Sequence, residues 1–292
     1  MKTRTKEKRL PDKWSLAVVQ MGATQEVRHN LGAILAMLAE AARQNVQLAV
    51  LPECVLSGYM YNSGQEALSR AVYADGSEIT EIADACVRHN LFAVVGYLER
   101  DAAGRLYNSA VLIANDGQRL ANYRKTHLPY LGVDRFVDPG QLPPPVVATK
   151  LGLIGLAICY DLRFPESART LALRGADVIA QPSTWPAAAS MLADHFQLVR
   201  ACENHVYIAV ANRPDQEAGA SFIGRSQIVD PTGQRIAEAD RDTEGLSIAS
   251  VDIAHAREKR IVTVPGDYEV SLFADRRPGL YGELVAQHPT DR

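Results

Sequence analysis

Short apolar runs alternate with longer amphipathic segments along most of the chain. The run WSLAVVQM, residues 14–21, is rich in Val and Leu, and in residues 24–45 apolar side chains recur every three or four positions. The first pattern is typical of a buried strand and the second of an amphipathic helix. Residues 46–53 predict a second buried strand, and residues 78–90 a second helix. The chain is therefore predicted to begin as β-α-β-α.

Three shorter runs in the middle of the chain predict a β-meander. These β-like runs lie at residues 91–99, 106–116 and 118–125. Asp101 to Gly104 and Asp116-Gly117 lie between them, and Asp and Gly favour tight turns. The stretch DPGQLPPP that follows predicts a rigid loop, because Pro fixes φ and cannot donate to a strand ladder.

The second half of the chain repeats this order of elements without a repeat of residues. We predict strands at residues 151–158, 177–183 and 206–213, helices at 165–176 and 187–205, a hairpin over 222–240 and a last strand at 245–253. Helices and strands that alternate in two comparable halves predict an α/β protein whose sheets are covered by helices.

No linker or low-complexity segment divides the chain, so we predict one domain over residues 13–282. Residues 1–12 are basic but lack the apolar stretch and cleavage site of a secretory signal, and they predict a flexible N-terminal tail. Residues 283–292 predict a C-terminal tail. No window reaches the roughly 18 to 20 apolar residues that span a bilayer, so a membrane partner is not expected.

Composition and charge narrow the function classes further. The chain has 31 Lys and Arg against 34 Asp and Glu, a formal charge of −3, and this balance argues against nucleic acid as a partner. The four cysteines are widely scattered and form no C-x-x-C pair, which argues against a zinc site and a disulfide framework. We expect a protein of the reducing cytoplasm, with no metal and no cofactor.

Three chemically useful side chains stand where predicted strands end. Glu53, Lys125 and Cys159 each close a buried run, and in open α/β sheets ligands gather outside the carboxyl ends of strands. Taken singly, each has an ordinary interpretation as a turn cap, a solvated lysine or a small core residue. Together they offer a nucleophile, a base and a cation.

At these residues the chain resembles the carbon–nitrogen hydrolases of the nitrilase superfamily. The segments that carry the resemblance are LPE with SGY, YRKTHL and GLAICYDLRFPE, followed by ADVIAQPSTWP, RACENHVYIAVANR and FIGRSQIVDPTG. The resemblance extends from Trp14 to about Gly282. It implies a four-layer α-β-β-α sandwich and a catalytic set of Glu53, Lys125 and Cys159. In this interpretation the apolar run holds Cys159 rigid, and the turn after it exposes the sulfur.

The resemblance also implies a mechanism. Glu53 would act as base, Cys159 would attack a small amide to give a thioester, and Lys125 would stabilise the thiolate and the oxyanion. The backbone N–H of Tyr160 directly follows the nucleophile and is a second candidate donor to the oxyanion. Many members carry a further glutamate before the Pro-Gly; here the only nearby carboxylates are Asp134 and Asp138, and whether Asp134 replaces it is left open.

The substrate is less specified than the reaction. Tyr59, Trp185 and Asn212 are candidates for the pocket wall because each lies just beyond a strand end. Members that cleave N-carbamoyl amino acids commonly carry two arginines after C-x-D, whereas this chain has Leu162 and Arg163. We expect Arg163 to pair with a neighbouring carboxylate, Asp161 or Glu166. Amides therefore rank first, N-carbamoyl compounds second and nitriles third.

Two other classes stay open at this stage. A papain-like cysteine hydrolase would pair Cys159 with His127 or His195, although no matching nucleophile motif supports it. The other is a non-catalytic α/β binding protein. By resemblance we also expect a homodimer or larger assembly, in which residues 275–285 either reach a partner subunit or cover their own sheet edge.

Overall fold

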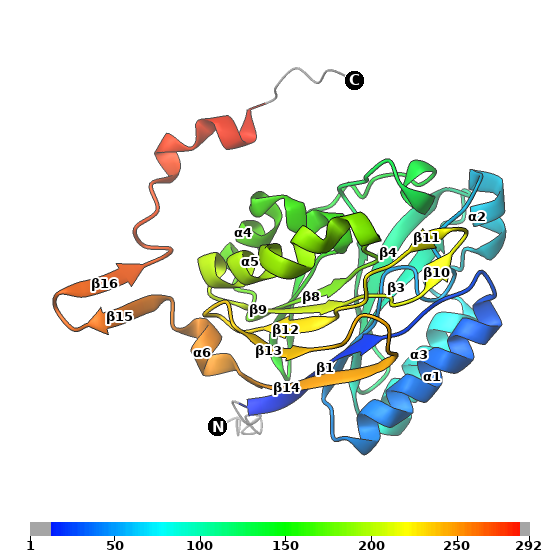
Figure 1. The fold of residues 1–292 in the computed structure, drawn as a ribbon, viewed down its shortest axis with the longest axis horizontal. Coiled ribbons are helices and arrows are strands. Elements are labelled where there is room, and N and C mark those ends of the chain that lie inside the picture. Colours follow the sequence, from blue (N-terminus) through cyan, green and yellow to red (C-terminus); the bar gives the residue numbers. More distant parts are fainter. Residues whose placement is uncertain (1–12, 287–292) are drawn as a thin grey trace, which may run out of the picture.

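Two six-stranded sheets lie face to face at the centre of the molecule (Figure 1). The structure is a computed structural model that describes residues 13–286, so the predicted N-terminal tail and residues 287–292 lie outside it. The first sheet contains β1 (Lys13–Gln20), β2 (Leu48–Val50), β3 (Phe92–Arg100), β4 (Leu106–Ile113), β5 (Arg119–Arg124) and β14 (Gly245–Asp252). Its order is β14-β1-β2-β3-β4-β5, with β1, β2 and β3 parallel.

The second sheet repeats this plan with a parallel centre and antiparallel edges. It contains β6 (Val146–Thr149), β7 (Gly152–Leu156), β8 (Val178–Pro182), β9 (Tyr207–Ala211), β12 (Gln227–Val229) and β13 (Arg235–Glu238). The order is β13-β12-β9-β8-β7-β6, and β7, β8 and β9 run parallel. The hairpin β12–β13 turns where Asp230 accepts the backbone N–H groups of Thr232 and Gln234, as the sequence predicts.

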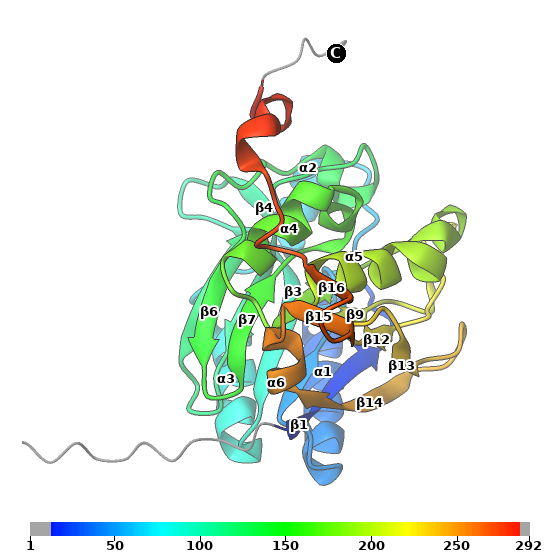
Figure 2. The same ribbon diagram turned by 90° about the vertical axis from the view of Figure 1, so that its left-hand side faces the viewer.

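Helices cover the outer face of each sheet and complete four layers. Figures 1 and 2 show α1 (Val27–Arg43) and α3 (Ser77–His89) against the first sheet, and α4 (Pro165–Leu173) and α5 (Gln197–Asn204) against the second. The predicted α-β-β-α sandwich is therefore confirmed. Two shorter helices, α2 (Gly64–Arg70) and α6 (Ile253–Arg257), were not predicted.

The alternation of side chains along β1 explains why the layers form. Leu16 and Val18 are fully buried against the second sheet, whereas Ala17 and Val19 belong to the core beneath α1 and α3. Successive side chains of a strand point to opposite faces, so a strand apolar at every position must be covered on both sides. The near-continuous apolar runs of the sequence are the cause of this double coverage.

The helix predicted over residues 187–205 is interrupted in the structure. A 3-10 turn spans Ala187–Ala189, a π-helical turn spans Leu192–Phe196, and only then does α5 begin. The π turn changes the phase of the helix by about one residue. As a result the Phe196 ring lies beside two guanidinium groups, 5.8 Å from that of Arg163 and 5.6 Å from that of Arg200.

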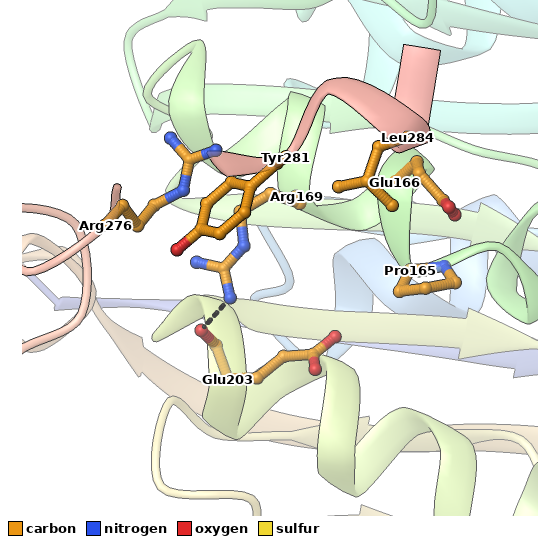
Figure 3. Close-up of a pocket in the computed structure, with 7 residues that line it drawn as sticks. All are labelled: Pro165, Glu166, Arg169, Glu203, Arg276, Tyr281 and Leu284. Carbon is orange, nitrogen blue, oxygen red and sulfur yellow. Dashed lines mark hydrogen bonds between the residues drawn. The ribbon is translucent and has the colours of Figure 1, made fainter. Parts of the chain in front are cut away.

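The predicted last strand, β14, is followed by a further hairpin that the sequence analysis missed. Strands β15 (Arg260–Val264) and β16 (Tyr268–Ser271) pair with each other and project from the sandwich (Figure 1). Beyond the hairpin, residues 276–284 run past α4 and α5. There Arg276, Tyr281 and Leu284 line a pocket together with Arg169 and Glu203 (Figure 3). In residues 13–286 no helix has the length and apolar character that crossing a membrane requires.

Candidate active site

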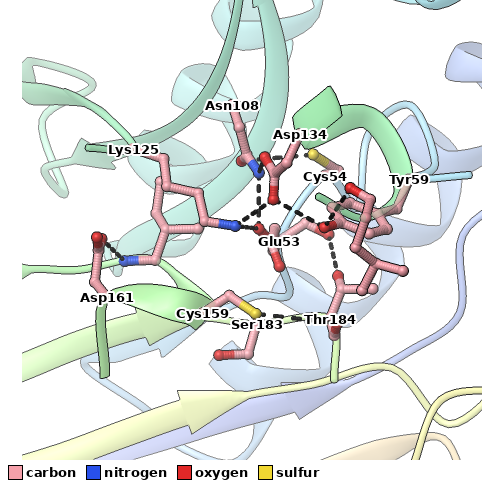
Figure 4. A network of polar contacts seen from close by, with 12 residues as sticks. Glu53, Cys54, Tyr59, Asn108, Lys125, Asp134, Cys159, Asp161, Ser183 and Thr184 are labelled. Carbon is pink, nitrogen blue, oxygen red and sulfur yellow. Dashed lines mark hydrogen bonds and ion pairs between the residues drawn. The ribbon is translucent and has the colours of Figure 1, made fainter. Parts of the chain in front are cut away.

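The structure brings the three strand-end residues of the sequence analysis to one place between the sheets (Figure 4). Lys125 directly follows β5, Glu53 lies three residues beyond β2, and Cys159 lies three residues beyond β7. All three residues are buried, with exposed fractions of 0 % for Glu53, 1 % for Lys125 and 7 % for Cys159. The expectation that the turn exposes the sulfur is therefore wrong, because the facing loops cover it.

Lys125 is held by two carboxylates. Its Nζ lies 2.7 Å from Oε1 of Glu53 and 2.5 Å from Oδ2 of Asp134. Charge-assisted hydrogen bonds of this kind are about twice as strong as neutral ones, and they offset part of the cost of removing an ammonium from water. The cation is thereby kept charged and fixed in orientation.

Asp134 occupies a place that its sequence spacing did not predict. It lies on a 3-10 turn, Gly132–Arg135, and accepts hydrogen bonds from the Tyr59 hydroxyl at 2.8 Å and from Asn108 Nδ2 at 2.9 Å. Gly132 has a φ of +51°, and a Cβ there would lie 2.2 Å from the Tyr59 ring. The close approach of this turn brings the short aspartate side chain within reach of Lys125.

Asn108 is a site residue that the sequence analysis missed. Its Nδ2 donates to Oε1 of Glu53 at 2.7 Å as well as to Asp134, so one amide joins both carboxylates. The signal available in the sequence was a pair of polar residues, Asn108 and Ser109, inside the mainly apolar run LYNSAVLI of β4. A polar side chain is normally buried only where another group can form a hydrogen bond with it, but the sequence of the run does not identify that group.

Cys159 stands on a strained turn. Its φ of +41° lies in the left-handed region, which costs a non-glycine residue on the order of 1–3 kcal/mol. Two buried side chains hold the turn: Asp161 Oδ2 accepts the Ile158 N–H at 2.9 Å, and Gln181 Nε2 donates to the Cys159 carbonyl at 2.9 Å. The strain directs the side chain toward Thr184, whose carbonyl lies 4.0 Å from the sulfur.

The same 3-10 turn offers a backbone donor for a negatively charged oxygen. The N–H of Asp161 donates to the Ile158 carbonyl. The N–H of Tyr160 has no hydrogen-bond acceptor among residues 13–286. An N–H that follows the nucleophile and has no internal partner suits an oxyanion. The Tyr160 side chain itself packs edge-on against Phe164, 5.2 Å between ring centres.

Glu53 is positioned by backbone contacts from both sheets. Its N–H donates to the Ser183 carbonyl at 3.3 Å, and its carbonyl accepts the Thr184 hydroxyl at 3.0 Å, both from the loop after β8. On the other side, a Cβ on Gly96 of β3 would lie 2.6 Å from the Glu53 Cα, so only glycine permits this approach. Oε2 of Glu53 is buried and has no hydrogen-bond partner within the described chain.

Burial is the largest influence on the pKa of the Glu53 carboxyl and on the pKa of the Cys159 thiol. It raises the pKa of the Glu53 carboxyl, an effect that Lys125 opposes and Asp134 reinforces. Burial and the charge of Glu53 raise the pKa of the Cys159 thiol, and Lys125 again opposes the rise. Cys159 therefore rests as a thiol, and Oε2 of Glu53 has no hydrogen-bond donor among the described residues that competes for it.

The remaining predicted residues have different surroundings. Tyr59 and Trp185 are each 1 % exposed, and Asn212 is fully buried. The Asn212 side chain accepts the Trp185 N–H at 2.8 Å and donates to the Gly224 carbonyl at 2.7 Å, so it fixes the loop that carries Thr184 and Trp185. Its two polar groups are thus engaged within the protein.

The predicted ion pair of Arg163 does not form. Asp161 instead bonds with the Tyr123 hydroxyl at 2.8 Å and with His127 Nδ1 at 2.6 Å, and the Arg163 guanidinium lies over the Phe196 ring. The His127 ring stacks on Phe164, 3.9 Å between ring centres, and among the described residues no hydrogen bond joins His127 or His195 to the Cys159 sulfur, so the structure gives no support to a Cys–His pair. Within residues 13–286 no cluster of three or more His, Cys, Asp or Glu is placed to hold a metal ion.

The chain is similar to known proteins over most of its length. The profile of the carbon-nitrogen hydrolase family matches residues 15–261. The chain is 36% identical over 246 residues to a nitrilase of Pyrococcus abyssi, which covers 84% of this chain and 90% of that protein. It is 31% identical over 293 residues to a citrullinase of Francisella tularensis, which covers 94% and 98%.

A solved structure shares the fold. The amidase of Nesterenkonia superposes with a TM-score of 0.77 at 25% identity, covering 93% of this chain and all of that one. A glutamate-to-glutamine variant of that amidase shows covalent addition of the acetamide moiety of fluoroacetamide at its active-site cysteine.

Replacing Asp134 by Asn should alter the pH dependence of the reaction. The substitution removes the charge that reinforces the raised pKa of Glu53, so this pKa falls and the acid limb of the pH–rate profile moves to lower pH. We expect kcat to fall by about 10²- to 10³-fold, because Lys125 loses one of the two anions that orient it. The measurement is kcat as a function of pH.

Asp138→Asn is the matched control, since this exposed aspartate lies four residues further along the same segment. It should leave both the acid limb and kcat unchanged. An acid limb that moves to higher pH in Asp134→Asn, or a kcat equal to that of the wild type, would contradict the assigned role of Asp134.

Proposed function

The chain belongs to the carbon–nitrogen hydrolase family, and we propose that it hydrolyses a small amide to a carboxylic acid and ammonia through a thioester on Cys159. The observation that carries this proposal is the arrangement of Lys125. Its ammonium is fully buried and held between Glu53 and Asp134, in the space where Cys159 faces the end of β8. A fixed cation beside a nucleophile and a base suits acyl transfer.

In the first half of the reaction Cys159 attacks the amide carbonyl. Oε2 of Glu53 takes the thiol proton as the S–C bond forms, and the carbonyl oxygen becomes an oxyanion held by Lys125 and the Tyr160 N–H. When the C–N bond breaks, Glu53 returns the proton to the leaving nitrogen. Ammonia departs, and the acyl group stays on the sulfur as a thioester.

In the second half water replaces ammonia. Glu53, again ionised, takes a proton from the attacking water, and the same two donors hold the second oxyanion. The C–S bond then breaks, the proton moves from Glu53 to the sulfur, and the carboxylic acid leaves. The net change is the addition of one water across a C–N bond, with the enzyme returned to its starting state.

The relatives named above span amides, ureido compounds and nitriles, and the structure favours the first of these for this chain. In N-carbamoyl substrates that carry a carboxylate, a cation must meet that charge. The first position after Asp161 is Leu162, which is buried in the core, and the Arg163 guanidinium packs on Phe196. Only one of the two positions therefore carries a cation, because Leu162 has no charge to meet a substrate carboxylate, and this supports small amides over carbamoyl amino acids.

A second candidate function, a non-catalytic binding protein, would leave the strained Cys159 turn without a purpose. We expect Cys159→Ala to abolish ammonia release while the thermal transition stays near that of the wild type, because a small apolar residue fits this buried site. The control is Cys54→Ala, which removes a buried thiol that adjoins Glu53 and donates to Asn108 Oδ1 at 3.6 Å but has no assigned step, so most of the activity should remain. Activity retained in Cys159→Ala, or lost equally in Cys54→Ala, would overturn the assignment.

The same assay ranks the substrates. Ammonia release is followed over short aliphatic amides, ω-amido acids, N-carbamoyl compounds and nitriles, with Cys159→Ala as the background. Turnover confined to nitriles would replace the amide by the nitrile reaction. Carbon dioxide released together with ammonia would identify a carbamoyl hydrolase.

We also propose that the chain assembles as a homodimer or larger oligomer. Apolar side chains stand exposed on the outer helices and on the C-terminal segment, among them Leu173, Val199, Leu284 and Val285. Exposed apolar surface that extends over neighbouring elements is unusual for a monomer. A second copy of the chain that covers α4, α5 and residues 276–284 would bury it.

Sedimentation equilibrium at micromolar concentration tests this assembly. We expect a mass of two or more chains, and Val199→Glu, at a position half exposed on α5, should shift the distribution toward the monomer. Glu81→Lys, on the opposite outer layer at α3, is the control and should leave the mass unchanged. A wild-type protein that sediments as a monomer would contradict the proposal.

A further inference from the structure

The loop after β9 contains a buried arginine between two carboxylates. Arg213 is fully buried, and its guanidinium bonds with Asp215 at 2.7 and 2.9 Å and with Oε2 of Glu217 at 2.7 Å. A further N–H donates to the Ala23 carbonyl at 2.7 Å. A buried cation with two anions leaves one net negative charge, which needs additional donors.

The two carboxylates accept hydrogen bonds from donors on different segments of the chain. Asp215 accepts the N–H of Ala23 at 3.2 Å, in the loop after β1. Glu217, on the short strand β10 (Gln216–Glu217), accepts the N–H of Tyr59 with both oxygens, at 2.9 and 3.1 Å. Only the second contact leads toward the reacting groups.

Gly58 shows that the contact with Glu217 is closely fitted. Its φ is +79°, and a Cβ at this position would lie 2.6 Å from Oε1 of Glu217. The positive φ favours glycine in the SGY segment, and the approach of this carboxylate leaves no room for a Cβ unless Glu217 moves. The backbone of Tyr59 is fixed by Glu217 immediately next to it.

From Tyr59 an unbroken series of buried contacts reaches Lys125. The Tyr59 hydroxyl donates to Asp134 Oδ2 at 2.8 Å, and the same oxygen lies 2.5 Å from the Lys125 ammonium. The Tyr59 ring has no freedom to adjust, because it is 1 % exposed and Gly132 packs against it. A shift of the Tyr59 backbone is thus transmitted to the oxygen that holds Lys125.

We propose that Glu217, with its charge balanced by Arg213, is a positioning residue that sets the place of Lys125 through Tyr59 and Asp134. The proposal rests on the proposed function for its catalytic meaning. Asp215 shares the same arginine but contacts the loop after β1, so it serves only the packing of that loop. The two carboxylates therefore form a natural matched pair for a test.

The test compares Glu217→Ala with Asp215→Ala by the rate at which iodoacetamide alkylates Cys159, followed by peptide mass spectrometry. Misplacement of reacting groups by about 1 Å costs on the order of 10²-fold in rate, so we expect Glu217→Ala to slow alkylation about 10- to 100-fold. Asp215→Ala should remain near the wild-type rate at a similar loss of thermal stability. Glu217→Gln keeps an acceptor for the Tyr59 N–H and should restore most of the rate.

Gly58→Ala provides a second route if Glu217→Ala fails to fold. It keeps the carboxylate but displaces it, and it should also slow the alkylation of Cys159. Equal rates in Glu217→Ala and Asp215→Ala, or a wild-type rate in Gly58→Ala, would overturn the proposal. Alkylation needs no amide turnover, so a wild-type protein that labels at Cys159 yet hydrolyses no amide would refute the proposed function alone.

If the protein turns over an amide substrate, kcat and KM of the same variants distinguish a positioning role of Glu217 from a role in substrate binding. Glu217→Ala should lower kcat with little change in KM, because the displaced ammonium acts mainly on the oxyanion. A rise in KM at constant kcat would assign Glu217 to substrate binding and would also overturn the proposal.

Discussion

The buried ammonium of Lys125 constrains the rest of the site. Moving an ion out of water costs several kcal/mol of free energy unless other charges and hydrogen bonds replace its solvation. Glu53 and Asp134 supply the charges, and the excess negative charge is met by donors from Tyr59 and Asn108. Each of these groups is fixed by the need to satisfy its neighbours. The result is a preorganised cation, which under the proposed mechanism does not have to reorient when an oxyanion forms.

The two sheets contribute different parts of this arrangement. The first sheet supplies Glu53, Lys125 and Asn108, whereas the second supplies Cys159 and the loop with Thr184. The relative position of the Cys159 sulfur and the Glu53 carboxylate is therefore set by how the sheets pack, and the contacts of Glu53 with the loop after β8 fix it directly. The four-layer sandwich therefore contributes to the site, because a rigid interface between the sheets keeps the sulfur and the carboxylate at a fixed distance from each other.

Local patterns were enough to predict sheets covered by helices and to single out the three strand-end residues, because periodicity and strand ends are encoded within a few positions of the chain. The four-layer sandwich followed from the resemblance of the motifs to a family. Other features depend on contacts between distant segments. Asn108 is marked only by being polar within a buried run, and Glu217 carries no local signal, since their partners lie 55 and 158 residues away in sequence. The π turn before α5 is likewise absent from the local pattern, and it coincides with the place of the Phe196 ring beside Arg163 and Arg200.

A partitioning experiment with hydroxylamine tests the central claim, a thioester on Cys159, most directly. Two substrates that share an acyl group but differ in leaving group, a primary amide and its methyl ester, are turned over in the presence of hydroxylamine. A common thioester predicts the same ratio of hydroxamate to acid from both substrates, rising linearly with hydroxylamine concentration. A ratio that depends on the leaving group, or the absence of hydroxamate at every concentration, would contradict the account.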